Sequence, residues 1–137
     1  MTIRLHREGG LFVVEVALSF KNREKDHEVR LVLDTGAAIT IVDTDIINHL
    51  GYSAGEDGIR RSALDGAAGK SVGYVIKMPT FKSLGHELTG FEIACHDMDT
   101  RLGVAGLLGM NFLNHFRVDM NFNSGEIFRI ENLTQLQ

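Results

Sequence analysis

A chain of 137 residues has the length of one domain, and we expect a single domain over residues 1–137. Its 44% hydrophobic and 23% charged residues exclude a disordered chain, and the net charge of −4 with no basic run argues against nucleic acid as a partner. No apolar stretch approaches the roughly 18 residues of a membrane span, and the first residues have no apolar signal segment. We therefore expect no membrane partner and a cytoplasmic location.

The first half of the chain consists of short apolar runs separated by turn residues. A glycine pair at 9–10 is typical of a hairpin turn. Asp43 or Thr44 can cap a short helix over 45–50, which Gly51 would end. Alternation and β-branched content predict strands over 2–7, 11–20, 28–34 and 39–43.

The second half of the chain also consists of short apolar runs separated by turns. Residues 58–77 read as a long hairpin around a tip at 65–70, interrupted after its return strand by Pro79. Further elements are a strand over 86–97, about two helical turns over 110–116 and a closing hairpin over 116–130. Many short strands with one or two short helices predict a mainly β fold, a small closed β barrel.

Cofactor sites are not predicted. The lone Cys95 excludes an internal disulfide and a cysteine-based metal cluster, and its place in an apolar alternation predicts a packed core thiol. The six histidines lie far apart, and the cluster 95–99 lacks a second set of ligands at metal-binding spacing. "GAAGKS" lacks the early glycine of a phosphate loop, because Leu64 stands at that position. We expect no metal and no cofactor.

Asp34 lies where an apolar strand passes into Gly-Ala-Ala, in "LVLDTGAAIT". A half-buried carboxylate is costly unless it is paired, hydrogen-bonded or neutralised. Asp34 is therefore either an ordinary turn residue whose carboxylate accepts local N–H groups, or a residue placed there for chemistry.

Two motifs together decide between these readings. "LVLDTGAAITIV" (31–42), followed about seventy residues later by "GLLGMNFL" (106–113), resembles the retropepsin-like aspartic proteases, which comprise retroviral proteases and their cellular relatives. The resemblance covers about 28–130, and the tail 106–127 is especially similar to the cellular, DNA-damage-inducible relatives. It implies a small closed β barrel of the retropepsin-like acid protease type, with a flap hairpin.

The resemblance also implies an activity, aspartic endopeptidase cleavage of a polypeptide substrate. Asp34 would be the catalytic residue. Thr35 would fix the two active loops against one another, Gly36 would let backbone approach the carboxylates, and Ala37 would continue the small residues. In "GLLG", the residues expected to support the loop are Leu107, Leu108 and Gly109.

Substrate contacts are expected at two places. One is Ala38, where many relatives have an acidic or polar residue instead. The other is the tip of the flap hairpin, over about 62–76, which departs from the Gly-Gly-rich retroviral pattern. The tip residues expected to contact substrate are Gly66, Ala67, Ala68 and Gly69.

The chain has one Asp-Thr-Gly, whereas the mechanism requires two carboxylates. We therefore expect a homodimer in which Asp34 of each subunit meets on a two-fold axis. Two alternatives remain open, a catalytically inactive dimeric module that binds extended peptides or a regulatory partner, and a structural dimerisation domain. The N-terminal strand could belong either to the dimer interface or to the barrel.

Overall fold

The computed structural model describes residues 2–66, 69–99 and 103–133. These residues form many strands and a few short helices, which confirms the mainly β prediction. The strands are β1 (Ile3–Arg4), β2 (His6–Glu8), β3 (Leu11–Ser19), β4 (Asp26–Leu33), β5 (Ile41–Asp43), β6 (Arg60–Gly66), β7 (Gly69–Ser83), β8 (His86–His96), β9 (Gly106–Leu108), β10 (Phe116–Asn121) and β11 (Glu126–Asn132). The helices are α1 (Thr44–His49), α2 (Ala54–Asp57) and α3 (Met110–Leu113).

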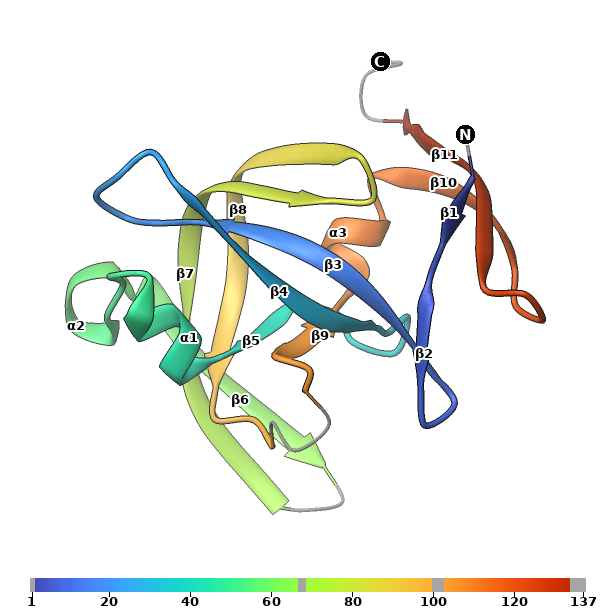
Figure 1. Ribbon diagram of the computed structural model, residues 1–137. Coiled ribbons are helices and arrows are strands. Elements are labelled where there is room, and N and C mark those ends of the chain that lie inside the picture. Colours follow the sequence, from blue (N-terminus) through green and yellow to red (C-terminus); the bar gives the residue numbers. More distant parts are fainter. Residues whose placement is uncertain (1, 67–68, 100–102, 134–137) are drawn as a thin grey trace.

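The larger sheet closes on itself. Its strand order is β2-β3-β4-β9-β5-β8-β7-β6, and β3 also pairs with β7. The strands β3, β4, β9, β5, β8 and β7 therefore form a closed ring, from which the hairpin of β6 and β7 extends (Figure 1). A second sheet, in the order β1-β11-β10, lies at one side of this ring (Figure 1).

The predicted N-terminal strand over 2–7 is two strands in different sheets. β1 pairs with β11, whereas β2 pairs with β3. The chain changes sheets at Leu5, whose side chain is buried and whose N–H donates to the carbonyl of Gly125 at 2.8 Å. Alternation alone does not reveal such a change, because it gives the face of each residue and not its partner strand.

The core is built by the inward faces of the strands. Along β3, Val14, Val16 and Leu18 alternate with more exposed residues and are buried, as half-buried strand positions should be. The sequence prediction of a core thiol is confirmed, because Cys95 is buried and free, and burial raises its pKa to about 12. In the described residues, no helix is long and apolar enough to cross a membrane.

The helices differ from the predictions at their ends. Asp43 stands at the N-cap of α1, but its carboxylate accepts the N–H of Met98 at 2.9 Å and makes no capping bond. The helix α2 was not predicted; Ser53 caps it through the N–H of Glu56. α3 is one turn and not two, because the chain enters β10 at Phe116.

Pro79 does not interrupt the return strand, contrary to the prediction. β7 is 15 residues long, Gly69–Ser83, and it includes Pro79. The β7–β8 register pairs Met78 with Phe91 and resumes with Thr80 and Thr89, so Pro79 falls at a position where the ladder needs no N–H from it.

Candidate active site

The end of β4 is held by the distant "GLLG" segment. β4 and β9 run parallel, with Leu33 opposite Leu108. The N–H of Asp34 extends this ladder by donating to the carbonyl of Leu108 at 3.0 Å. The two motifs that carried the resemblance are therefore adjacent in space, and Leu108 is fully buried behind the Asp34 turn.

The Asp34 carboxylate is oriented by its own turn. The side chain is half-buried, and its Oδ1 accepts the N–H of Gly36 at 2.8 Å. The carbonyl of Asp34 accepts the N–H of Ala37 at 3.2 Å. These local bonds are those of an ordinary Asx-type turn, and they also hold the carboxylate in one direction at the strand end.

Two glycines allow the chain to pass close to this turn. A Cβ on Gly36 would lie 3.1 Å from Oδ1 of Asp34. A Cβ on Gly109 would lie 2.7 Å from the carbonyl oxygen of Ala37 and 2.8 Å from that of Ile39. The N–H of Met110 then donates to the carbonyl of Ala37 at 2.7 Å. The small residues predicted at 36 and 109 thus occupy the places of closest approach.

A buried polar network, which the sequence prediction missed, ties the two loops together. Thr40 is fully buried, and both its N–H and its hydroxyl donate to Oδ1 of Asn111 at 2.8 Å. The Thr40 hydroxyl accepts the N–H of Gly109 at 3.1 Å, and the Asn111 amide donates to the carbonyl of Glu92 at 2.8 Å. The available signal was polar residues inside apolar runs, Thr40 in "ITIV" and Asn111 in "MNFL".

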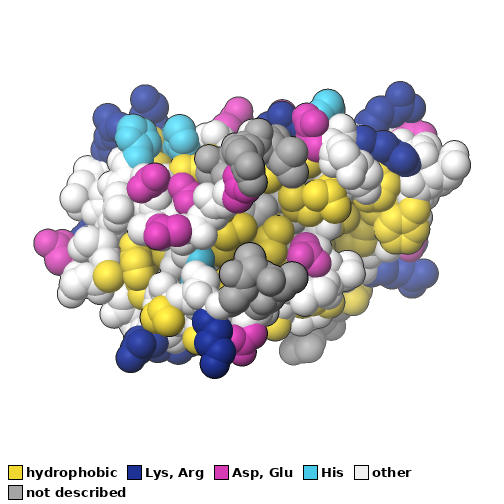
Figure 2. Space-filling view, turned by 90° about the horizontal axis from the view of Figure 1, so that it is seen from below, with side chains coloured by type: hydrophobic (Ala, Val, Ile, Leu, Met, Phe, Trp, Pro, Cys, Tyr) yellow, Lys and Arg dark blue, Asp and Glu magenta, His cyan; other side chains and the backbone are white. Residues whose placement is uncertain are grey.

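Thr35, Gly36 and Ala38 are exposed, whereas Asp34 and Ala37 of the same turn are partly buried. Thr35 is also at the edge of an apolar cavity of about 240 Å³. Figure 2 shows hydrophobic side chains gathered on the side of the molecule where β10 and β11 lie. The cavity is lined by Leu33, Thr35, Leu84, Met110, Leu113, Phe116, Val118, Met120, Phe122 and Ile127, and we call it the Thr35 groove.

The β6–β7 hairpin lies where the flap was predicted. Its strands pair from Arg60 and Val75 to Gly66 and Gly69, and the predicted contact residues Ala67 and Ala68 lie outside the described residues. Leu64 of this hairpin packs against a small apolar cluster whose buried members are Ile41, Val75 and Ala94. Ile39 and Leu107, from the two loops around Asp34, pack against the same cluster.

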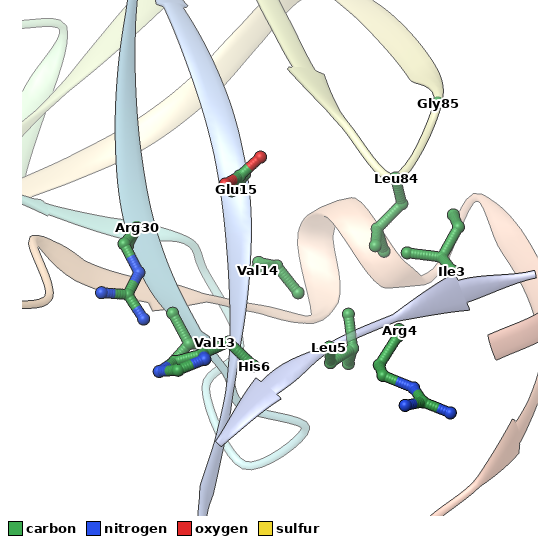
Figure 3. A pocket seen from close by; sticks show the side chains of 10 residues that line it. All are labelled: Ile3, Arg4, Leu5, His6, Val13, Val14, Glu15, Arg30, Leu84 and Gly85. Atoms are coloured by element: carbon green, nitrogen blue, oxygen red, sulfur yellow. The ribbon is translucent and has the colours of Figure 1, made fainter. Parts of the chain in front are cut away.

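A larger cavity of about 680 Å³ lies elsewhere, between the β1–β2 bend, β3 and the β7–β8 turn. Figure 3 shows Ile3, Leu5 and Leu84 facing a common space, with the guanidinium groups of Arg4 and Arg30 at opposite sides of the labelled group. No residue of the Asp34 turn lines this cavity. Size alone therefore does not mark the chemical site in this molecule.

Comparison with known proteins agrees with this geometry. A family model described as aspartyl protease matches residues 18–112, which include Asp34, the hairpin and "GLLG". The chain belongs to the aspartyl protease family. The resemblance to retropepsin-like proteases is thereby confirmed. No curated protein matches the sequence of this chain.

Solved structures show the same fold. A retropepsin-like aspartic protease from Rickettsia conorii has a TM-score of 0.64 at 18% identity, over 93% of this chain and 87% of that one. The EIAV protease, in complex with an inhibitor, has a TM-score of 0.53 at 21% identity, over 74% of this chain and 84% of that one. At these identities the likeness concerns the fold of this chain and not its substrates.

Proposed function

We propose that this aspartyl protease is a homodimeric endopeptidase in which the Asp34 carboxylates of two subunits activate water together. One observation supports this above all, the position of Asp34. Its half-buried carboxylate stands at the end of β4, held by Leu108 through the backbone and by Gly36 through Oδ1. The Cβ-free Gly36 leaves space beside that oxygen.

The chemistry requires a pair. Two carboxylates about 3 Å apart cannot both ionise, so they share one proton. The ionised carboxylate takes a proton from water, whose oxygen bonds to the peptide carbonyl carbon, while the protonated carboxylate polarises the carbonyl oxygen. Breakage of the C–N bond follows when a proton passes to the leaving nitrogen. With one Asp-Thr-Gly in the chain, the second carboxylate comes from a second copy.

The Thr35 groove supports the dimer. It joins the Asp34 turn to the strands β10 and β11, and Phe122 at its border is 71% exposed. A large exposed aromatic beside an apolar cavity is a feature of surfaces that bind a partner. A second copy seated there would cover Phe122 and bring the two Thr35 side chains, and hence the two Asp34 side chains, toward one axis.

The substrate would be an extended peptide with apolar side chains. Ile39, Leu64 and Leu107 are only partly buried and border one apolar cluster between the hairpin and the Asp34 turn. Such a surface accepts alternate side chains of a strand-like peptide, whose backbone pairs with the enzyme. Gly66 and Gly69, the last pair of the hairpin, and the exposed Ala38 are the backbone groups proposed to contact it.

Asp34→Asn tests the mechanism. The variant keeps the size of the side chain and its acceptor for Gly36, but it cannot share a proton with its copy. We expect cleavage of a denatured protein to fall by at least about a thousandfold, with the dimer preserved in sedimentation. The matched control is Asp45→Asn, an exposed carboxylate on α1 that should cleave as the parent does. Parental activity in Asp34→Asn would refute the mechanism.

An inactive peptide-binding module remains the second candidate, and Ala38 is the observation that favours it. This exposed position has no carboxylate to contact a peptide backbone. The two functions differ in one measurement. Binding of extended peptides without turnover, across about pH 4 to 8, favours the module, whereas turnover inhibited by pepstatin-type compounds favours the endopeptidase.

A further inference from the structure

A serine–histidine–serine cluster lies at the base of the β6–β7 hairpin, apart from the Asp34 turn. His96, the last residue of β8, is 1% exposed. Its Nε2 lies 2.8 Å from the hydroxyl of Ser62 on β6, and its Nδ1 lies 2.9 Å from the hydroxyl of Ser71 on β7. One buried ring thus contacts both strands of the hairpin.

The cluster marks the point where the hairpin leaves the sheet. The β7–β8 ladder has its last pair, Tyr74 and Cys95, one residue before His96. Beyond it, the described residues 69–73 of β7 pair with β6 alone. A Cβ on Gly73 would overlap the carbonyl of Cys95 and lie 2.9 Å from Nδ1 of His96, so the glycine lets β7 pass directly over the ring.

The two serines share one face of the hairpin with Leu64. Ser62 is opposite Gly73 and Leu64 is opposite Ser71, and residues two apart on a strand point the same way. This face is turned inward, whereas Val72 on the other face is 64% exposed. The histidine that holds Ser62 and Ser71 therefore also sets the position of Leu64 against the apolar cluster shared with Ile39 and Leu107.

We infer that His96 is a positioning residue of the peptidase site, which it serves by fixing the hairpin through Ser62 and Ser71. The inference rests on the proposed function, because it places a substrate between the hairpin and the Asp34 turn. Neutral imidazole has one donor and one acceptor nitrogen, and a serine hydroxyl can serve either. Both bonds can therefore form at once with the hairpin in a single position.

The double variant Ser62→Ala/Ser71→Ala removes both hydroxyls and adds no bulk. The hairpin is proposed to bind the substrate equally in the ground state and in the transition state. KM for an extended peptide should therefore rise about tenfold, while kcat stays within about twofold of the parent value. Amide exchange over 60–66 and 69–73 should also become faster. Ser62→Thr/Ser71→Thr keeps both hydroxyls on strands that favour β-branched residues, and it should restore KM to within about twofold.

Ser83→Ala is the matched control. Ser83 also lies on β7, at the strand's other end, where it is buried and its hydroxyl donates to the carbonyl of Glu15 at 2.9 Å. This variant should lose stability but keep the parental KM.

The outcomes separate the two proposals. Parental KM in the double alanine variant, with an active parent, overturns the role of His96 alone. Unchanged amide hydrogen exchange over the hairpin in the double alanine variant overturns the anchoring of the hairpin by His96. A parent that cleaves no peptide overturns the proposed function and the positioning role together, whereas exchange still reports whether the serines anchor the hairpin.

Discussion

Gly36 and Gly109 flank Asp34 in space, but a methyl group at each would meet a different kind of neighbour. At Gly36 the neighbour is the end of a side chain, Oδ1 of Asp34 at 3.1 Å. At Gly109 the neighbours are backbone atoms of Ala37 and Ile39, within 2.8 Å. A side chain can rotate away at little cost, whereas backbone held by hydrogen bonds resists displacement. We therefore expect the two glycines to have separable roles, Gly36 in the proposed catalysis and Gly109 in stability.

Gly36→Ala should lower activity more than stability. The added methyl group displaces the carboxylate that Gly36 now leaves in place, and small displacements of reacting groups are costly. We expect kcat to fall at least about tenfold, while the free energy of unfolding in urea stays within about 1 kcal/mol of the parent.

Gly109→Ala is the comparison for this variant. The overlap with backbone should lower the free energy of unfolding by about 1–3 kcal/mol. Full activity in Gly36→Ala, or equal losses of stability in the two variants, would contradict the division of roles.

At the scale of elements, three strands meet at His96. β6 and β7 contribute a serine each, and β8 ends at the histidine. Burial lowers the pKa of His96 below its ordinary value of 6.5, while the charge of neighbouring Asp97 acts in the opposite direction. Asp43, opposite His96 in the β5–β8 register, is also buried, and its carboxylate accepts the N–H of Met98. Because its pKa is lowered, the His96 ring is neutral at pH 7 when the chain is folded.

This pKa direction predicts how stability changes with pH. Above about pH 6.5 His96 is neutral in both states, so its contribution is complete. As the pH falls below that value, the unfolded chain binds a proton that the folded chain does not, and the free energy of unfolding decreases. Urea unfolding from pH 7.5 to 5 should show a steeper loss in the parent than in His96→Asn. Equal slopes would mean that His96 titrates alike in both states.

At the scale of the whole molecule, the ring of strands buries the core, but the Thr35 groove stays open at its side. A homodimer formed there would make activity depend on protein concentration, because a monomer has one Asp34. Phe122 lies at the groove border and is the most exposed of the large apolar side chains described. It is therefore the residue through which the dimer is best tested.

Phe122→Asp should weaken the dimer by placing a carboxylate in an apolar interface. We expect the dimer dissociation constant, measured by sedimentation equilibrium, to rise at least tenfold, about 1.4 kcal/mol. Activity should fall at low protein concentration and recover at high concentration. Ile59→Asp is the matched control, since Ile59 is 51% exposed between α2 and β6 and lines no part of the groove. Equal dissociation constants in the two variants would place the dimer interface elsewhere.

From the sequence by itself, alternation predicted most of the strands, and the resemblance to retropepsin-like proteases pointed to the Asp34 turn and to "GLLG". Alternation places side chains on faces, and small residues mark close approach, so each of these signals lies within a short stretch of sequence. Only the tertiary structure decided which distant residues contact one another and which strands pair. Thr40 meets Asn111 across 71 positions, His96 meets Ser62 across 34, and Leu5 turns the chain between two sheets. Hydrogen bonds between distant residues leave no periodic trace in the sequence, because each needs only one polar residue in an apolar run.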